Sequence, residues 1–360
     1  MKFIHIADTH LGAMPDAGKA FTEQRPKELW DTFGKVIDLC EEEGTDLLLI
    51  AGDMFHRQPL LRELKEVNYL FSKLSHTQVV FIVGNHDYLK KDSYYRRFDW
   101  SKNVHTILST EMDSVVFEDM ELAVYGFSYD KREILEARYD EADAPFRYKY
   151  EILLAHGGDL RHIPYSRNKI VSLGYNYVAF GHIHKPHIID ERKESTGRGN
   201  PAGGVAAFAG ALEPLDKNDV GEHGFIRGEI DEEGTRIEFV PFSKRQYIHG
   251  AVRINQEMTN GFIRDNLKDK LAKRGVDNLY KLTFRGMRKP DFYLNMEDLN
   301  PYGNILEIVD ETKPAYDFGK LMEQNEDNLL GKFIAQFIDS EEDSVERMAL
   351  FEGVQALMKE

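Results

Sequence analysis

Short apolar runs alternate with longer segments of helical periodicity over the first part of the chain. Such runs are typical of strands buried on both faces, and the segments between them repeat their apolar positions every three to four residues. In chain order, the expected strands and helices are Phe3–Ile6, about Thr22–Glu43, Leu47–Ile50, about Leu60–Leu74 and Val79–Val83. We therefore expect an α/β domain in which helices pack outside buried strands.

The later apolar runs follow one another without helical segments between them. Six further strands are expected at Leu122–Tyr125, Ile152–Ala155, Tyr177–Phe180, Ala206–Phe208, Phe225–Ile230 and Ile237–Val240. Since strands joined without a crossover helix usually pair antiparallel, this half of the domain should be more antiparallel. Pro241 and the polar stretch Ser243–Gln246 then predict a linker.

The chain beyond this linker predicts two smaller modules. Apolar runs at Tyr247–Ile254 and Leu279–Phe284, with a helix near Gln256–Lys273 between them, indicate a small α+β module. From about Tyr316 onward, the apolar spacing fits two helices. The expected domains are residues 1–243, a capping domain at 244–312 and a helical tail at 313–360, and a length of 360 residues agrees with several modules.

Composition is that of a soluble globular protein, with 42% hydrophobic residues, 30% charged residues and a mean hydropathy of -0.48. No apolar run approaches the roughly 18 to 20 residues of a membrane span, and the first residues lack the order of a signal peptide. We therefore expect a cytoplasmic protein without membrane contact. Cys40 is the only cysteine, which excludes an internal disulfide and a Cys-cluster metal site, so nitrogen and oxygen must hold any metal.

Charge is unevenly distributed in a chain whose net charge is -16. Residues 244–291 hold 12 basic and 5 acidic residues, a net +7, whereas residues 311–360 hold 5 basic and 12 acidic, a net -7. The basic module can contact DNA phosphates without reading sequence, and an ordinary solvated basic face is the alternative. The candidate DNA contacts are Lys273, Arg274, Arg288 and Lys289.

Acidic, amide and histidine side chains follow the ends of five expected strands. In chain order they are Asp8 and His10, Asp53 and His56, Asn85, His86 and Asp87, His156, and His182 and His184. Strand carboxyl ends in open α/β sheets converge on one crevice, where ligands bind. Each group alone has an ordinary interpretation as a turn or a cap, but five coincidences are improbable. The sequence therefore predicts a metal site.

The set fits two divalent ions. Two groups of four share one member: Asp8, His10, Asp53 and His184, and Asp53, Asn85, His156 and His182. The Asp53 carboxylate can bridge because it offers two oxygens. A centre of about +2 lowers the pKa of a bridging water and holds a phosphodiester oxygen, which is the two-metal arrangement for displacement at phosphorus.

Three neighbouring side chains are candidates for catalysis. His86 follows the Asn85 ligand, and its ring can stabilise the reacting oxygens or protonate the leaving oxygen. Asp87 is expected to orient that ring, and His56 is a second candidate on the phosphate side. A purely structural hydrogen bond is the alternative for His86.

The motifs resemble those of a known superfamily. Asp8-x-His10, Gly52-Asp53, Gly84-Asn85-His86-Asp87, His156 and Gly181-His182-x-His184 resemble the signature of calcineurin-like metallophosphoesterases. The neighbouring residues, and Ala209–Asp216 with Gly221–Phe225, resemble double-strand-break-repair nucleases of the SbcD type. This resemblance implies a four-layer sandwich of mixed sheets flanked by helices, with a capping domain and a helical tail. It also implies manganese, although the mixed ligands suit iron or zinc as well.

The predicted function is a metal-dependent DNA exonuclease and endonuclease of DNA repair. The resemblance further implies that the capping domain faces DNA and that the acidic tail docks on an SbcC-type ATPase subunit. A tail packed on its own core explains the same apolar stripe, and a homodimer is a further assembly to test. Two other functions stay open: a phosphodiesterase for a small nucleotide, and a non-catalytic DNA-end scaffold.

Overall fold

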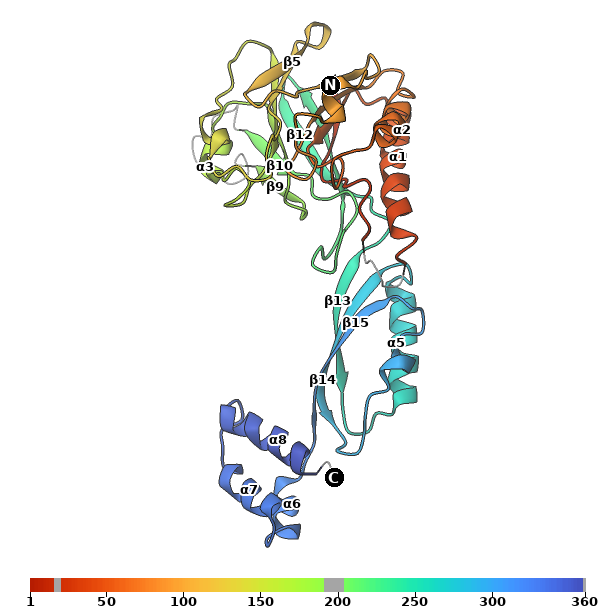
Figure 1. Ribbon diagram of the computed structural model, residues 1–360, viewed down its shortest axis with the longest axis vertical. Coiled ribbons are helices and arrows are strands. Elements are labelled where there is room, and N and C mark those ends of the chain that lie inside the picture. The colour runs from red at the N-terminus through yellow and green to blue at the C-terminus, as the bar shows by residue number, and fades with distance from the viewer. Residues whose placement is uncertain (16–20, 191–203, 359–360) are drawn as a thin grey trace. The chain divides into compact units, whose positions relative to one another are not determined.

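The computed structural model describes residues 1–15, 21–190 and 204–358, and the chain forms two compact units, residues 1–247 and 248–360 (Figure 1). The first unit contains two six-stranded sheets. Sheet one has the order β12-β11-β1-β2-β3-β4. Its strands are β1 (Lys2–Ile6), β2 (Leu47–Ala51), β3 (Gln78–Ile82), β4 (Val104–Thr106), β11 (Gly224–Asp231) and β12 (Gly234–Pro241). β1 to β4 run parallel, and β11 and β12 are antiparallel.

Sheet two has the order β5-β6-β7-β8-β10-β9. Its strands are β5 (Asp113–Phe117), β6 (Leu122–Gly126), β7 (Tyr150–His156), β8 (Tyr177–Gly181), β9 (His187–Asp190) and β10 (Val205–Phe208). The four central strands are parallel, and only the edge strands β5 and β9 are antiparallel. The expectation of a more antiparallel second half is therefore wrong for this sheet, because long irregular connections make the crossovers that helices usually make.

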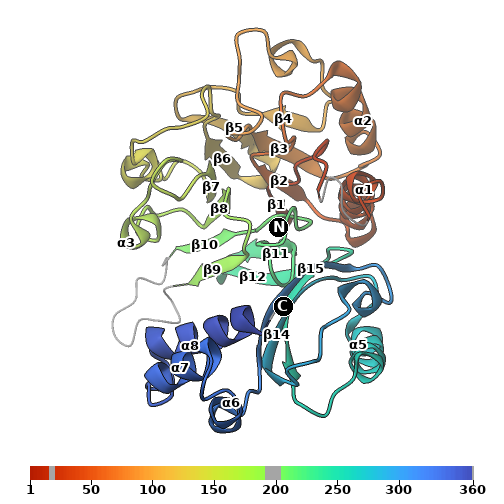
Figure 2. The ribbon, with the colours of Figure 1, turned by 60° about the horizontal axis from the view of Figure 1, so that its bottom comes forward.

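The two sheets pack face to face, with a core between them and a second core under two helices. In β2, Leu47 and Leu49 face the other sheet, while Leu48 and Ile50 face the helices. This alternation explains why the strand reads as a continuous apolar run. The covering helices are α1 (Arg25–Glu43) and α2 (Leu61–Phe71), seen beside sheet one in Figure 2.

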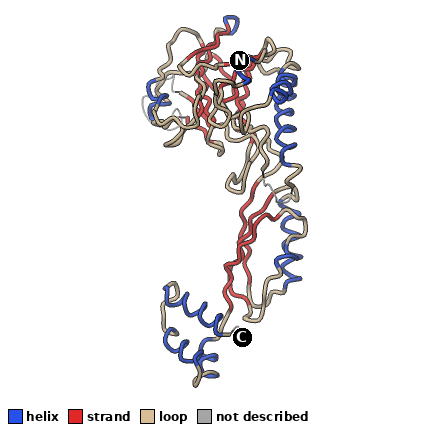
Figure 3. Tube along the Cα trace, in the orientation of Figure 1, coloured by secondary structure: helices blue, strands red, loops and turns tan. Residues whose placement is uncertain are grey.

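The outer face of sheet two is covered differently. Its core is closed by loops, the short helix α3 (Arg167–Ile170) and a 3-10 turn at Arg138–Glu141. Figure 3 shows how much of this region is loop rather than helix. Further 3-10 turns lie at Tyr94–Arg97 and Glu118–Met120. The four-layer α/β sandwich is confirmed, with a fourth layer made largely of loops.

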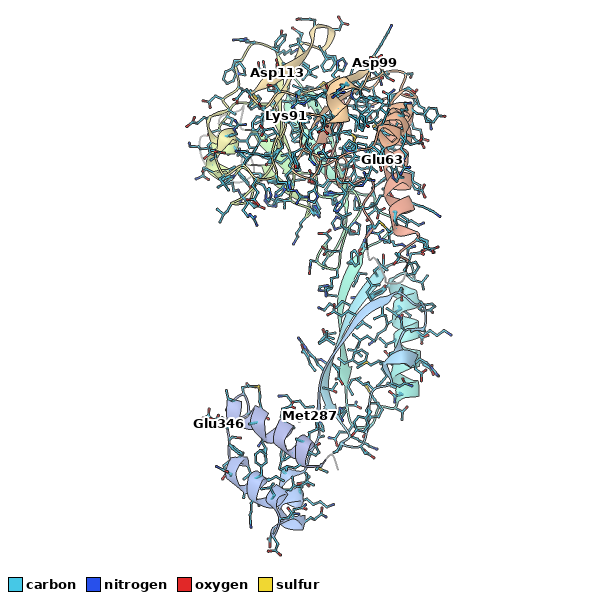
Figure 4. All side chains as sticks on the ribbon, in the orientation of Figure 1. Glu63, Lys91, Asp99, Asp113, Met287 and Glu346 are labelled. Atoms are coloured by element: carbon cyan, nitrogen blue, oxygen red, sulfur yellow. The ribbon has the colours of Figure 1, made fainter. Side chains whose placement is uncertain are left out.

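The second unit begins with a three-stranded sheet in the order β13-β14-β15. Its elements are β13 (Tyr247–Ile254), α5 (Asn260–Arg274), β14 (Leu279–Arg288), a 3-10 turn at Met296–Leu299, and β15 (Ile305–Pro314). α5 packs on the sheet through Ile263, Leu267 and Leu271. Met287 is exposed on β14 (Figure 4).

The tail contains three helices, not the two predicted. They are α6 (Phe318–Gln324), α7 (Leu329–Phe337) and α8 (Val345–Leu357), with Glu346 in the first turn of α8 (Figure 4). Asn328 caps α7 through hydrogen bonds from two backbone amides, which separates α6 from α7. The helices pack around Phe318, Ile334 and Leu350. Among the described residues, no helix has both the length and the apolar character needed to cross a membrane.

Candidate metal centre

The structure brings all seven predicted metal ligands together at the carboxyl ends of five strands. β1, β2 and β3 of sheet one contribute four of them, and β7 and β8 of sheet two contribute three. The ligands therefore meet where the two sheets present the same edge. Their side chains form two groups that meet at Asp53.

The first group contains Asp8, His10 and His184, whose potential ligand atoms all lie within 4.8 Å of one another. The Nε2 atoms of His10 and His184 are 3.2 Å apart. Asp8 accepts a hydrogen bond from the His182 amide at Oδ2, while its Oδ1 is buried and has no hydrogen-bond partner among residues 1–15, 21–190 and 204–358. A buried acceptor without a donor is costly, and a cation held with the two imidazoles would satisfy it. The residues therefore fit a metal ion.

The second group contains Asp53, His156 and His182, with Asn85 between the two rings. Asn85 Oδ1 lies 2.9 Å from His156 Nε2 and 3.0 Å from His182 Nδ1. His156 Nδ1 donates to the Ala51 carbonyl at 2.8 Å, which leaves Nε2 to act as a ligand. This arrangement of imidazole, carboxylate and amide oxygen also fits a divalent ion.

Asp53 lies between the two groups. Its Oδ2 is 3.4 Å from His156 Nε2 and 3.9 Å from His10 Nε2, whereas Oδ1 accepts a hydrogen bond from the His86 amide at 2.8 Å. The same oxygen therefore faces both groups. The sequence prediction shared the two carboxylate oxygens between the groups, whereas in the structure Oδ2 faces both groups and Oδ1 accepts the His86 amide.

The backbone around these ligands is tightly constrained. Asp8, His10 and Asp53 have φ values of 44–48°, in the left-handed region that few residues other than glycine adopt. Gly52 has a φ of 83°, and a Cβ there would overlap the His156 ring. A Cβ at Gly84 would overlap the Asp53 carboxylate. Gly52 and Gly84 are thus required because ligand side chains occupy the positions that a Cβ would take.

The buried carboxylates set the charge of the site. Burial works to raise the pKa of Asp53, but the imidazoles of His156, His10 and His86 together outweigh it and hold that pKa below its usual range. Burial dominates at Asp8 and raises its pKa to about 6. At His156, burial works to lower the pKa, yet the Asp53 carboxylate raises it to about 9. Asp53 is therefore ionised and ready to hold a cation.

His56 and His86 lie beside His10. The Nδ1 atoms of His56 and His10 are 3.3 Å apart, and the ring centroids of His10 and His86 are 4.7 Å apart. His86 Nδ1 lies 3.2 Å from the His56 carbonyl, so its Nε2 is the nitrogen available to a substrate. Both candidates therefore border the metal-binding groups.

Asp87 is placed differently from the prediction. It is buried and accepts hydrogen bonds from the amides of Phe55 and Gly84 and from the Tyr95 hydroxyl at 2.7 Å. The His56 carbonyl, rather than Asp87, contacts the His86 ring. The expectation that Asp87 orients His86 is thus corrected, because the Asp87 carboxylate is used to hold the loops after β2 and β3.

Two carboxylates beside the centre were missed by sequence reasoning. Asp159 Oδ2 is 2.9 Å from His182 Nε2, and Asp219 Oδ2 is 3.1 Å from His184 Nδ1. Metal-binding histidines usually have such a partner on the second ring nitrogen. This general rule predicts that a partner exists, but it does not identify the residue. No fixed spacing along the chain identifies which acid supplies it.

The four candidate DNA contacts lie in the second unit. Lys273 and Arg274 are exposed in the last turn of α5, and Lys289 is exposed just after β14. Arg288 is buried, donates to the Phe292 carbonyl at 2.8 Å and lies 5.5 Å from the centroid of the Tyr293 ring. The structure therefore presents three of the four side chains to solvent and uses the fourth within the fold.

Comparisons with known proteins identify the family of the chain. Residues 1–186 match the family described as Calcineurin-like phosphoesterase. The "Uncharacterized metallophosphoesterase YhaO" of Bacillus subtilis (strain 168) is 30% identical over 343 residues, 86% of this chain and 76% of that protein. The "DNA double-strand break repair protein Mre11" of Methanocaldococcus jannaschii is 27% identical over 281 residues, 75% of this chain and 70% of that protein. Among solved structures, a dimetal phosphatase from Danio rerio aligns with 68% of this chain and 99% of its own, at 11% identity and a TM-score of 0.38.

Proposed function

The chain belongs to the calcineurin-like phosphoesterases, and from this premise we propose that it is a metal-dependent DNA nuclease of DNA repair. Its general activity follows from the family: it is a metal-dependent phosphoesterase. The choice of DNA as substrate is supported by relatives named as DNA double-strand break repair proteins. The observation that carries the proposal is the position of Asp53 Oδ2 between two groups of metal ligands.

We propose that the centre holds two divalent ions, with manganese as the native metal. Asp8, His10 and His184 would hold one ion, His156, His182 and Asn85 the other, and Asp53 both. Two such ions, when bound, would supply a nucleophilic water at neutral pH and neutralise charge on the reacting phosphate. Iron and zinc fit the same ligands, so metal analysis of the purified protein is part of the test.

The side chains of the protein itself supply the remaining steps. His86 Nδ1 donates to the His56 carbonyl, so Nε2 faces the substrate, and the imidazolium form of His86 can donate the Nε2 proton to a phosphate or leaving-group oxygen. His56 is exposed beside His10 and can contact a second phosphate oxygen. Asp87 acts indirectly, since it holds the loops that carry Asp53 and Asn85.

The direct test is an assay of the purified full chain with manganese on four substrates. These are duplex DNA, single-stranded DNA, a dinucleotide and a bis-nitrophenyl phosphate ester. The proposed nuclease cleaves the small ester and at least one form of DNA. Turnover of the dinucleotide without cleavage of DNA would support the small-nucleotide phosphodiesterase instead. DNA binding without cleavage of any substrate would support the non-catalytic scaffold.

We further propose that residues 244–312 form a capping domain that contacts DNA through Lys273, Arg274 and Lys289. Their exposure supports this role, whereas Arg288 supports the fold of the domain. Replacing all three by alanine should weaken duplex binding and lower the slope of log affinity against log salt by up to about 0.9 per lost phosphate contact. The matched control replaces the exposed Lys35, Lys65 and Lys102 of the first unit, and equal effects of both triple variants would refute the assignment.

For the tail, residues 313–360, we propose docking on an SbcC-type ATPase subunit. The support is an apolar surface left by its three helices, where Val345 is 71% and Leu329 is 68% exposed. Val345→Asp should prevent co-purification with such a subunit and leave hydrolysis of the small ester unchanged. A homodimer is the other proposed assembly, and the mass of the purified chain in solution tests it.

A further inference from the structure

The two histidines of Gly181-His182-Ile183-His184 are held by carboxylates that lie outside the sheets. His182 Nε2 is 2.9 Å from Asp159 Oδ2, and His184 Nδ1 is 3.1 Å from Asp219 Oδ2. His156 provides the contrast, because its second ring nitrogen meets the backbone carbonyl of Ala51. One ligand is thus fixed by the sheet itself and the other two by acids from loops.

We propose that Asp159 and Asp219 are positioning residues, and that each acts on a different metal ion. Asp159 would orient His182 for the ion held with Asn85 and His156. Asp219 would orient His184 for the ion held with Asp8 and His10. This inference rests on the proposed two-metal centre, and it predicts that the two ions can be weakened one at a time.

Hydrogen bonds from its own turn hold the Asp159 side chain in place independently of His182. Its Oδ1 accepts hydrogen bonds from the amides of Arg161 and His162, at 2.8 and 2.9 Å, and from the His162 ring at 2.8 Å. The same turn is tied to the preceding loop, since the Ile163 amide donates to the Ile134 carbonyl at 2.7 Å. Oδ2 therefore has a fixed position from which to accept the proton of His182 Nε2.

Asp219 is fixed by other means. Its Oδ2 also accepts the Leu215 amide at 2.8 Å, and its carbonyl lies 3.1 Å from Nε2 of the buried His223. The side chain of Asp219 is 13% exposed, whereas that of Asp159 is 45% exposed. The two carboxylates therefore belong to separate loops with separate supports, so changing one should leave the other in place.

The two contacts assign opposite tautomers to the two ligands. A carboxylate accepts but cannot donate, so His182 carries its proton on Nε2 and offers Nδ1, which faces Asn85. His184 carries its proton on Nδ1 and offers Nε2, which faces His10. Such partners fix the ring and increase its basicity, and their loss typically weakens metal affinity about 10- to 100-fold.

The test is manganese titration of the full-length wild type, Asp159→Asn and Asp219→Asn. Asparagine keeps the size of the side chain. At position 159 its Oδ1 can still accept the two backbone amides, while an NH2 in place of Oδ2 would face the imidazole N–H. At position 219, where Oδ2 meets both the Leu215 amide and the His184 ring, asparagine replaces the charged acceptor by a neutral amide. Wild type should bind two ions, and each variant should keep one affinity and lose about 10- to 100-fold in the other. Asp140→Asn is the control, because Asp140 accepts the Ser166 amide at 2.8 Å in a similar way.

Double variants identify the ion that each acid serves. Asp159→Asn should add no further loss to His182→Ala, but it should weaken the remaining ion in His184→Ala. Nitrogen NMR of the zinc-loaded protein supplies a second readout, since the two histidines should show opposite tautomers. Wild type with two ions and unchanged Asn variants would overturn the inference alone. Equal weakening of both ions by one variant would also overturn it, whereas a wild type that binds no metal would overturn the proposed function.

Discussion

The first unit contains two clusters of buried charged residues, which differ in how their carboxylates are paired. One is the metal centre. The other, which we call the ion-pair cluster, consists of Arg25, Glu28, Glu213 and Arg245. In the ion-pair cluster, Arg245 Nη2 lies 2.7 Å from Glu28 Oε1, and Arg25 Nη1 lies 2.9 Å from Glu28 Oε2. Every carboxylate there meets donors from its own chain.

The difference lies in the balance of donors and acceptors. Glu28 is buried, but hydrogen bonds from Arg245 and Arg25 outweigh burial and lower its pKa to about 2. At Asp8, burial prevails and the pKa is raised to about 6. A buried charge paired by its own chain fixes a structure, whereas buried acceptors that lack donors require a cation from outside. The metal centre can therefore bind a cation, whereas the ion-pair cluster is neutralised by its own side chains.

Asp53→Asn should have the largest effect. It removes the charge that faces both ligand groups, so hydrolysis of the small ester should fall to background and bound metal should fall with it. Without metal, the free energy of unfolding should also fall, because the variant removes the carboxylate that pairs with the buried His156 imidazole. Metal analysis, ester hydrolysis and urea unfolding measure the three quantities. Two bound ions and a rate near that of wild type would exclude a binuclear centre.

The metal centre was largely predictable from sequence because its ligands directly follow the carboxyl ends of strands. Asp8, Asp53 and His156 each follow an apolar run closely, and chain order alone places them at one edge of the sheets. The strands that sequence missed are β4, β5, β9 and β15, and all four are edge strands. An edge strand has one neighbour and exposed positions, as in the largely exposed β5, so it lacks the apolar signal.

His86→Asn should have the next largest effect and should separate chemistry from metal binding. His86 contributes its backbone amide to Asp53, and asparagine retains that amide. Metal content should stay near two ions while the rate falls roughly 10²- to 10⁴-fold, the range of a positioned acid or base. Loss of metal in parallel with rate would instead make His86 a metal ligand.

Glu28→Gln should affect the ion-pair cluster and leave the metal centre unchanged. Removing one partner of a buried ion pair leaves charge without a counterion, and we expect a loss of about 3 kcal/mol in the free energy of unfolding. Metal content and ester hydrolysis per folded molecule should be unchanged. A similar substitution at the exposed Glu238 is the control.

The pH dependence sharpens this prediction. The pKa of Glu28 is lowered from 4.5 to about 2, so its contribution is present above about pH 4.5 and is lost as the pH falls toward 2. The difference in unfolding free energy between wild type and Glu28→Gln should therefore shrink through that range. A difference that stays constant down to pH 2 would show that the charge of Glu28 is not what stabilises the cluster.

The ion-pair cluster could not be predicted from sequence. Glu28 lies in α1, Glu213 follows β10, and Arg245 lies after β12, so the three side chains are far apart in the chain. Nothing in their local patterns distinguishes them from surface charges. The same reason hid Asp159 and Asp219, whose partners lie 23 and 35 residues away. Sequence reveals a site where chain order and strand ends place it, and misses pairings that only packing creates.

Added manganese should have the smallest effect and should distinguish the clusters most directly. An ion that binds only the folded state stabilises it by about 2.7 kcal/mol at a concentration of 100 times Kd. Wild type and Glu28→Gln should gain the same stabilisation from manganese, because the carboxylates of the ion-pair cluster are already paired with donors of the chain. Asp53→Asn should gain much less, because its ligand groups are disrupted. Thermal unfolding with and without manganese measures all three, and an increment that differs between wild type and Glu28→Gln would show that the two clusters are coupled rather than independent.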